Sequence, residues 1–364
     1  METQSLNRWK FKIFFLCWIA YASIYFARVN LSVAIPFIQK TLVLDKVQVG
    51  LIGSLFFWIY GIGQFVNGYI GDKVSSKIFI FIGLFVTSLT NIFFGLTSNF
   101  SFMLVIWAIN GYFQSMLWGS IAKTLSYWFS HEERSRVAIA ISTSSVSGYI
   151  LSWGLSAKIL SNISWRWTFF IPGISTLIYS LIWFSKIKNH PNEVGYESPN
   201  IYANTQNSKS SSSLLSSISL WNIICKSRLW YIAIACFAQG IIKEGIGFSA
   251  PSFIIESHNL DFVSSSILFI PIMNFIGMLL AGWINKKLNY QEKLAAIILF
   301  GAGMITLLGL IMFGKSGPSA ALIFLGLCSA TMYGANTLLL GVIPMGFAKY
   351  NKVSSVAGFL DFCS

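Results

Sequence analysis

The sequence predicts an all-helical protein that crosses a membrane many times. Of its 364 residues, 55% are hydrophobic and only 10% are charged, whereas soluble domains carry about 25% charged residues. The mean hydropathy is +0.67, and apolar runs of about 20 residues, the length that a membrane-spanning helix needs, recur along the chain. The length of the runs and the lack of period-two alternation favour helices over barrel strands. This composition excludes a soluble enzyme, a disordered chain and a small disulfide-bonded scaffold.

Ten apolar runs are long enough to span a bilayer, and an eleventh begins late in the chain. The first six expected spans are Phe14–Pro36, Val49–Ile70, Ile78–Thr97, Phe102–Leu125, Val137–Ala157 and Trp167–Phe184. The next four are Leu229–Ile255, Ser265–Ile284, Leu294–Phe313 and Ala320–Ile343, and the eleventh starts at Val353. Three basic residues precede the first run, as in a signal peptide. Because that run is too long for one and contains Arg28, we interpret it as a retained helix.

A polar segment divides the chain into two membrane-embedded parts. The interval Lys186–Lys226 is serine-rich and contains two prolines, which is typical of a flexible linker. We therefore expect an N-terminal half at 1–185, a cytoplasmic linker at 186–227 and a C-terminal half at 228–364. The last half is expected to be incomplete, because twelve residues from Val353 onward cover about 18 Å of helix against a hydrocarbon core of about 30 Å.

Basic residues gather on one side of the predicted membrane. With the N-terminus inside, 17 of the 25 lysines and arginines fall in cytoplasmic segments and five in external loops. A cytoplasmic excess is typical of multi-pass proteins of the plasma membrane, here the bacterial inner membrane. The charge pattern accounts for the net charge of +13 without nucleic acid as a partner. The five scattered cysteines form no CxxC pair, and no nucleophile or metal constellation occurs, so we expect no enzyme, no cofactor and no metal.

Two features of the first part of the sequence recur in the second part, and the two pairs of residues are separated by almost the same number of positions. Arg28 and Lys243 are 215 residues apart, and the glycines that open the loops after the second and eighth spans, Gly68 and Gly282, are 214 apart. This predicts two homologous six-helix halves, related by a pseudo-twofold axis along the membrane normal. The substrate site of such a fold lies between the halves near the midplane.

Two basic side chains lie deep inside the predicted spans. Arg28 and Lys243 each stand about 15 residues into a span, where a charge costs at least ~2.5 kcal/mol. The acids expected at such depth are Glu244 and, in the eleventh span, Asp361. We interpret the two cations as a site for an anionic ligand. The alternative is an ion pair between Lys243 and Glu244, which we expect to be poorly disposed because adjacent helical residues point about 100° apart.

Polar residues recur at helical spacing beside these cations. The pattern places them on one face of each of five spans, which favours a polar central cavity, although any one pair also suits interhelical hydrogen bonding. The candidate binding residues, besides Arg28 and Lys243, are Tyr21, Tyr25, Tyr60, Gln64, Asn110, Gln114, Gln239, Tyr333 and Asn336. The run Ser142–Gly148 predicts close helix packing, with some hydroxyls reaching the cavity. Lys123 is expected to snorkel or to pack as a gate residue.

Several motifs resemble those of one transporter family. The segment from Gly68 to Lys77 has the form GxxGDKxxxK and resembles the loop signature of the major facilitator superfamily. Within that superfamily, four segments resemble the organophosphate:phosphate antiporters, which include glycerol-3-phosphate and hexose-6-phosphate carriers. They are YASIYFARVN (21–30), NGYFQSMLWGSIAKTLSYWFSHEER (110–134), HPNEVGY (190–196) and LWYIAIA (229–235). The resemblance runs from about residue 9 to the end of the chain.

The resemblance implies a two-half carrier in which one basic residue in the first helix and one in the seventh bind the phosphoryl group. Arg28 and Lys243 occupy those places. The family usually has an arginine in place of Lys243, a lysine in place of Gln64 and a histidine in place of Ser145. We also count Ser145 as a candidate binding residue. Residues expected to act in gating are Gly68, Asp72, Lys73, Lys77, Lys123 and Arg134. We expect the charge of Asp72 to contact nearby cations.

The sequence thus predicts a monomeric carrier in the lipid bilayer that exchanges a small anionic phosphate ester for inorganic phosphate by alternating access. The segment YFARVNLSVAIP also resembles symporters of sugar acids, but Ala27 stands where those have an acid. A membrane sensor of phosphate esters with the same fold is a further alternative.

Overall fold

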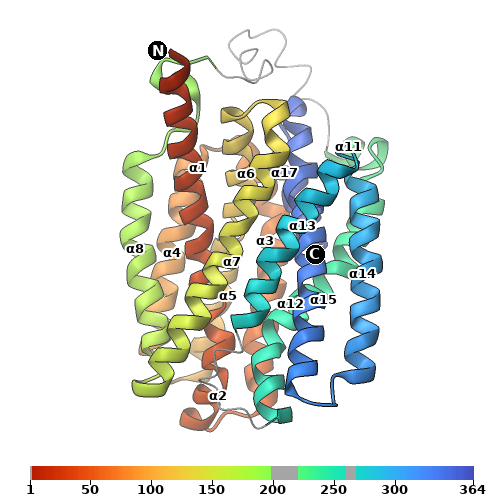
Figure 1. Cartoon of the computed structure of the whole chain (residues 1–364). Coiled ribbons are helices and arrows are strands. Elements are labelled where there is room, and N and C mark those ends of the chain that lie inside the picture. Colours follow the sequence, from red (N-terminus) through yellow and green to blue (C-terminus); the bar gives the residue numbers. More distant parts are fainter. Residues whose placement is uncertain (1, 198–219, 259–267) are drawn as a thin grey trace.

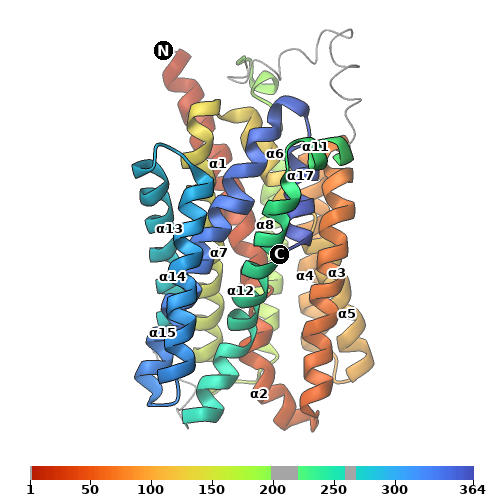
Figure 2. The same ribbon diagram turned by 90° about the vertical axis from the view of Figure 1, so that its right-hand side faces the viewer.

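The computed structural model describes residues 2–197, 220–258 and 268–364, and the elements assigned in these ranges are all helices. Ten helical stretches in this part of the chain are long and apolar enough to cross a membrane. The predicted all-helical membrane fold is therefore confirmed. The helices run side by side as a bundle, with the N-terminus at one end and α2 at the other (Figures 1 and 2).

The first six spans are built from eight helices. They are α1 (Glu2–Phe26), α2 (Asn30–Leu42), α3 (Lys46–Lys73), α4 (Ser76–Leu96), α5 (Phe100–Gln114), α6 (Leu117–Trp128), α7 (His131–Asn162) and α8 (Trp167–Lys186). Capping boxes start two of them: the Asp45 side chain accepts from the backbone N–H of Gln48 at α3, and Ser130 pairs with Glu133 at α7. Each box satisfies backbone donors that the first helical turn leaves unpaired.

The later part of the chain contributes four spans and a shorter apolar helix. Its elements are the 3₁₀ turn η1 (Pro191–Val194), α11 (Leu220–Lys226), α12 (Leu229–His258), α13 (Phe269–Lys287), α14 (Glu292–Phe313), α15 (Pro318–Asn336), the π-helical turn η4 (Thr337–Val342), α16 (Ile343–Met345), η5 (Gly346–Tyr350) and α17 (Val353–Phe362). The linker was predicted to be flexible throughout 186–227, but its two ends carry η1 and α11. Its serine-rich middle, 198–219, and the expected start of the eighth span at Ser265 lie outside the described residues.

Two spans predicted as single helices are interrupted. The first span is broken at residues 27–29 between α1 and α2, and the fourth is broken at 115–116 between α5 and α6. The prediction of continuous helices was wrong here, because buried polar side chains from other helices bind the backbone at these points. At the second break, Asn67 of α3 donates to the Tyr112 carbonyl at 3.4 Å and to the Ser115 hydroxyl at 2.7 Å.

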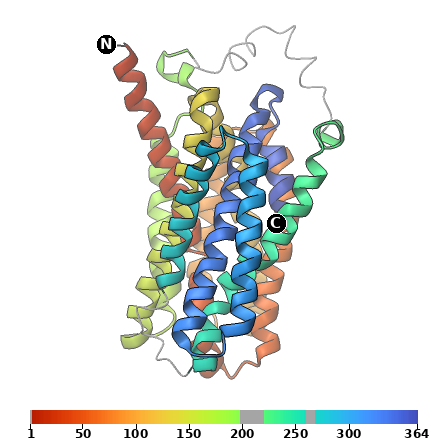
Figure 3. The ribbon, with the colours of Figure 1, turned by 45° about the vertical axis from the view of Figure 1, so that its right-hand side comes forward.

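The helices from the two parts of the chain pack reciprocally, as two repeats related by a pseudo-twofold axis do. The second span, α3, packs against α17, and the eighth span, α13, packs against α7. The two landmark glycines lie in these contacts: a Cβ at Gly68 would come within 2.8 Å of the Ser354 carbonyl, and one at Gly282 within 3.1 Å of Ile139. Figure 2 shows α3–α5 on one side, α13–α15 on the other and α12 between them. In Figure 3, α13 and α14 face the viewer.

Candidate functional site

The break in the first span places Arg28 in the interior of the bundle. The Ala27 carbonyl, which has lost its place in a continuous helix, accepts hydrogen bonds from three side-chain amides. These amides belong to Asn91 at 2.9 Å, Asn110 at 3.4 Å and Gln114 at 3.4 Å. Gln114 also accepts a 2.7 Å hydrogen bond from the Arg28 Nε. The buried amides of α4 and α5 therefore hold the backbone at the break and set the direction of the guanidinium.

Aromatic rings surround the Arg28 guanidinium. Its Cζ lies 4.2 Å from the ring centroid of Tyr60, 4.8 Å from that of Tyr25 and 5.5 Å from that of Phe56. Ring faces attract a cation without neutralising it. Among the residues that the structure describes, the buried Nη2 has no hydrogen-bond partner. Arg28 is thus a fixed, largely desolvated cation with a donor left over.

Lys243 stands on α12 from the other part of the chain and is equally buried. Its ammonium donates to the Asn336 side-chain oxygen at 3.1 Å and lies 2.9 Å from a Glu244 carboxylate oxygen. The expectation that Lys243 and Glu244 are poorly disposed to pair was wrong. Although their Cα–Cβ bonds diverge, both side chains are long enough for their heads to meet inside the bundle.

Arg28 and Lys243 line the same cavity, of about 810 Å³. The Tyr60 hydroxyl donates to the Asp361 carboxylate across it at 3.4 Å. The polar residues in the wall of this cavity come mainly from α1, α3, α12 and α17, and these helices belong to both parts of the chain. The charged and tyrosine side chains in its wall are Tyr25, Arg28, Tyr60, Lys243, Glu244 and Asp361. A smaller recess next to it holds Tyr21, Ser145 and Asn336 beside Lys243.

The remaining predicted binding residues are buried and support their neighbours. Gln64 donates to the Tyr60 hydroxyl at 2.5 Å, and Gln239 accepts from the Ser364 hydroxyl at 3.3 Å. Tyr333 packs edge-on against Tyr149, with their ring centroids 6.2 Å apart. Together with Asn110 and Gln114, these side chains position the residues that line the cavity.

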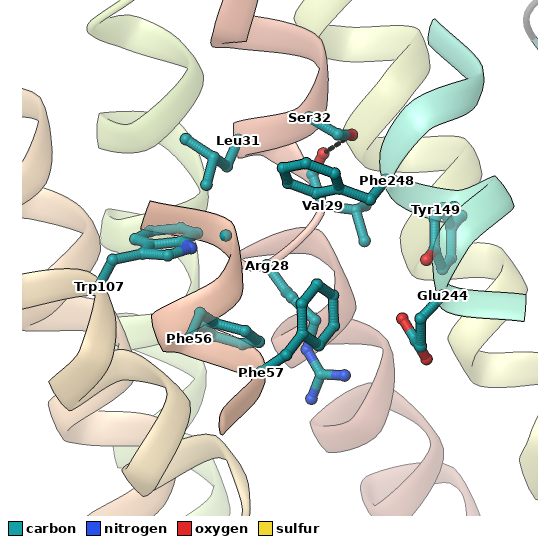
Figure 4. Close-up of a pocket in the computed structure, with 12 residues that line it drawn as sticks. Arg28, Val29, Leu31, Ser32, Phe56, Phe57, Trp107, Tyr149, Glu244 and Phe248 are labelled. Carbon is teal, nitrogen blue, oxygen red and sulfur yellow. Dashed lines mark hydrogen bonds between the residues drawn. The ribbon is translucent and has the colours of Figure 1, made fainter. Parts of the chain in front are cut away.

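A second pocket extends from Arg28 toward the α2 end of the bundle. It is small, about 30 Å³, and Arg28 and Glu244 line it together with aromatic rings. Phe57 of α3 and Phe248 of α12 meet edge-to-face there, with centroids 6.3 Å apart. Figure 4 shows the Arg28 guanidinium below the Phe57 ring, the Glu244 carboxylate to the side of that ring, and the Phe248 ring above both. The two rings thus form a contact between the two parts of the chain beside the charged groups.

At the end of the bundle where the N-terminus lies, Asp72 connects the two parts of the chain. Its carboxylate accepts from the backbone N–H groups of Ser354 and Ser355, each at 3.0 Å, and from the Ser355 hydroxyl. Its hydrogen-bond partners are the N–H groups at the start of α17, which carry a partial positive charge, and the nearby charge of Lys123 also acts on it. Lys123 donates to the carbonyls of Gly71, Asp72 and Val74 at 2.8–3.0 Å, so it packs against the end of α3 and does not snorkel.

The other predicted gating residues divide into two groups. Arg134 contacts the later part of the chain, because its Nη1 donates to the Met345 carbonyl at 3.3 Å. Lys73 and Lys77 lie over rings of the first part, 3.9 Å from the Tyr69 centroid and 4.7 Å from the Phe184 centroid. Asp72, Gly68 and Arg134 therefore lie in contacts between the two parts, whereas the ring partners of Lys73 and Lys77 belong to the first part.

Sequence reasoning missed Asn30 and Asn91. Asn30 donates to the side-chain oxygen of Asn91 at 2.9 Å and to the Thr168 carbonyl at 2.9 Å, and Asn91 binds the Ala27 carbonyl. Both are fully buried. An asparagine inside an otherwise apolar span was the signal that could have identified them, because such a side chain needs a partner in a membrane.

Comparisons with known proteins agree with this architecture. The family model described as "Major Facilitator Superfamily" matches residues 17–364. A probable hexose phosphate transport protein of Chlamydia trachomatis serovar D is 28% identical over an aligned length of 319 residues, and the alignment covers 83% of this chain and 70% of that protein. The glycerol-3-phosphate transporter of Bacillus subtilis strain 168 is 26% identical over 372 residues, covering 98% and 83%. The solved structure of the proton:xylose symporter XylE superposes with a TM-score of 0.73 at 13% identity, covering 98% of this chain and 86% of that one.

Proposed function

The chain belongs to the major facilitator superfamily, and we propose that it exchanges a phosphorylated organic anion for inorganic phosphate across the membrane. The proposed substrates are phosphate esters of the sugar phosphate or glycerol phosphate class. The protein works as a monomer in the plasma membrane, with its N-terminus and central linker in the cytoplasm, where the excess of lysine and arginine lies.

One observation carries this proposal: two cations from different parts of the chain line one cavity, and one of them has a free donor. Arg28 and Lys243 are 7% and 5% exposed. A phosphoryl group brings up to two negative charges and three acceptor oxygens, which suit a guanidinium and an ammonium that line one cavity. Each hydrogen bond to a charged group contributes about 1.5–3 kcal/mol. The likeness to carriers of hexose phosphate and glycerol-3-phosphate supports the same class of anion.

The contacts at the two ends of the bundle support a rocking mechanism. Asp72 and Arg134 join the two parts at the N-terminal end, while Phe57 and Phe248 meet toward the α2 end. These contacts lie toward opposite ends of the bundle, so they can open alternately while the central site stays in place. A bound phosphoryl group draws Arg28 and Lys243 together and lowers the barrier for the loaded carrier.

Counterflow into proteoliposomes tests the proposal. Vesicles that contain the purified chain and are loaded with unlabelled phosphate should take up labelled phosphate, and external glucose 6-phosphate or glycerol 3-phosphate should compete with it. Arg28→Gln, which removes the charge and keeps a polar side chain, should abolish uptake. Vesicles carrying Lys315→Gln, which changes a cation in the loop between α14 and α15, serve as the matched control.

The same vesicles separate the alternatives. Saturable binding of a phosphate ester without flux would indicate a sensor. Uptake of a sugar acid that needs no internal phosphate would indicate the sugar-acid symporter. Either result would contradict phosphate exchange.

A further inference from the structure

A second large cavity lies at the end of the bundle where the N-terminus lies, which is the upper end in Figure 1. Its volume is about 560 Å³, and its described lining residues do not overlap with those of the central cavity. Its walls come from both parts of the chain: the start of α7 on one side, and the loop before α14 and the turns around α16 on the other. Its polar and flexible lining consists of Glu132, Arg134, Arg136, Tyr290, Glu292 and Gly346. We call it the end cavity.

Arg134 is the buried cation of the end cavity. It is 6% exposed, and it donates to the carbonyls of Met345 at 3.3 Å and Ser126 at 3.4 Å. Both bonds are longer than the usual 2.9–3.0 Å, and the buried Nε has no partner among the described residues. Neutral carbonyls leave the charge of a guanidinium in place, and a hydrogen bond to an anion is about twice as strong. Arg134 therefore holds an unused donor and an unpaired charge at the wall of the cavity.

The charged side chains of the end cavity balance one another without pairing. Arg134 and Arg136 bring two positive charges, and Glu132 and Glu292 bring two negative ones. In the ranges that the structure describes, none of these four groups forms an ion pair. Carboxylates accept hydrogen bonds and guanidinium groups donate them. The cavity therefore suits a ligand that has both anionic acceptor groups and neutral donor groups.

Tyr290 adds an aromatic wall to the end cavity. Its backbone φ is 60° and that of Asn289 is 52°, a left-handed conformation that residues other than glycine rarely adopt. The Tyr290 N–H donates to the Asn285 carbonyl at 2.8 Å, which holds the loop in this form. Val342 and Ile343 add apolar lining. An apolar and aromatic wall with a few polar groups is typical of sites for small organic ligands.

We infer that the end cavity is a second binding site, which takes a soluble phosphate ester that carries hydroxyl groups. Its phosphoryl oxygens accept from Arg134 and Arg136. Its hydroxyl groups donate to the carboxylates of Glu132 and Glu292. Because the walls come from both parts of the chain, a bound ester bridges them and stabilises the arrangement in which this end is closed. Ester that accumulates on this side therefore slows exchange, a role that rests on the proposed function, whereas the binding site itself does not.

Cysteine labelling at Gly346 tests the site independently of the central cavity. Gly346 has a φ of −61°, and a Cβ there would meet no described atom within 4 Å, so Gly346→Cys places a thiol in the end cavity without strain. In the full chain with the native cysteines replaced by serine, glucose 6-phosphate should slow the reaction of this thiol with a maleimide. The protection should persist when Arg28→Gln is added, because Arg28 lines the central cavity and not the end cavity.

Two variants and two further ligands show which groups bind. Arg136→Gln changes an exposed side chain and should raise the half-protecting concentration of glucose 6-phosphate at least about tenfold, because a charge-assisted hydrogen bond is lost. Lys293→Gln is the matched control, since it changes an exposed cation of α14 that is not part of the cavity wall, and it should leave protection unchanged. Inorganic phosphate should need a higher concentration than glucose 6-phosphate, and glucose should give no protection.

The labelling results decide whether the site exists. Labelling that glucose 6-phosphate does not slow overturns the site. Protection that Arg28→Gln removes also overturns it, because the thiol then reports a conformational change that starts at the central cavity. Protection by phosphatidylglycerol in nanodiscs, without protection by glucose 6-phosphate, overturns the soluble ester and assigns a lipid headgroup.

Counterflow decides the inhibitory role. Excess glucose 6-phosphate on the side of the N-terminus should lower phosphate counterflow more strongly in the wild type than in Arg136→Gln. Equal inhibition of the two overturns the inhibitory role. Protection of the Gly346→Cys thiol in a chain whose wild type shows no counterflow overturns the proposed function and supports the end cavity as a binding site.

Discussion

Replacing Asp72 should loosen the contact between the two parts of the chain at the N-terminal end. Its carboxylate accepts three hydrogen bonds from Ser354 and Ser355 at the start of α17. Asp72→Asn removes the negative charge and one acceptor oxygen while keeping the side-chain shape. The rest of the interface, including the close approach of Gly68 and Gly358, stays in place.

The size of the effect follows from the energetics of helix termini. A side-chain cap at a helix N-terminus contributes about 0.5–2 kcal/mol, and a negative charge there adds about 0.3–1 kcal/mol. Asp72→Asn should therefore cost the closed contact about 1–2 kcal/mol, which is a factor of about 5–30 in the equilibrium between closed and open arrangements. Exchange requires both arrangements, so the rate should fall by a similar factor.

A buried reporter can measure this opening. Ser120 is fully buried and lies next to Gly71, which itself contacts Ser354. With the native cysteines replaced by serine, Ser120→Cys should react with a maleimide faster, by about 5–30-fold, when Asp72 is changed to asparagine. The affinity for phosphate should change little, because Asp72 is not part of the cavity wall.

Asp45→Asn is the matched control. Asp45 also caps a helix, α3, but it bonds to Gln48 in the same part of the chain and is exposed. This variant should leave both labelling and exchange unchanged. Equal labelling and equal exchange in Asp72→Asn and wild type would refute the reasoning and assign Asp72 the role of an ordinary loop charge.

Three further predictions concern the cavity. Arg28→Ala and Lys243→Ala should each weaken phosphate binding more than tenfold, since each removes a charged hydrogen-bond donor; normal counterflow in either variant would contradict the proposed site. Lys243→Arg should retain exchange and bind phosphate at least as tightly, because a guanidinium offers two parallel donors; a folded but inactive variant would show that the site needs a compact ammonium. Gln114→Leu should lower exchange at normal insertion, as it removes the acceptor that orients Arg28, and unchanged kinetics would show that the aromatic rings suffice.

Hydropathy predicted the spans well because membrane burial acts on every residue of a long segment. The expected sixth span, Trp167–Phe184, differs from α8 by two residues at one end. The breaks in the first and fourth spans could not be predicted in the same way. Each depends on side chains that are distant in sequence, such as Asn91 and Gln114 at the Ala27 carbonyl, and a local apolar pattern does not record such contacts.

The candidate site was predictable at residues whose burial in a membrane costs much free energy. Arg28 and Lys243 stood out because charge is expensive at that depth, and the structure places both on one cavity. Helical geometry gave the wrong answer for Glu244, because the 100° rule describes Cα–Cβ directions and not the reach of a flexible side chain. The partner of Asp72 was also hidden, since a helix N-terminus has no charged residue that a sequence would reveal.

The buried amides give a physical reason why a broken helix carries Arg28. In a continuous helix the Ala27 carbonyl would be satisfied by the chain itself, and Gln114 would have no backbone group to bind there. The break exposes that carbonyl, three amides gather on it, and the oxygen of one of them is left to accept from Arg28. The guanidinium is thus held by neutral groups on one side, and its Nη2 stays uncommitted. Dipoles and ring faces hold the Arg28 cation without neutralising its charge, whereas Lys243 is paired with the Glu244 carboxylate.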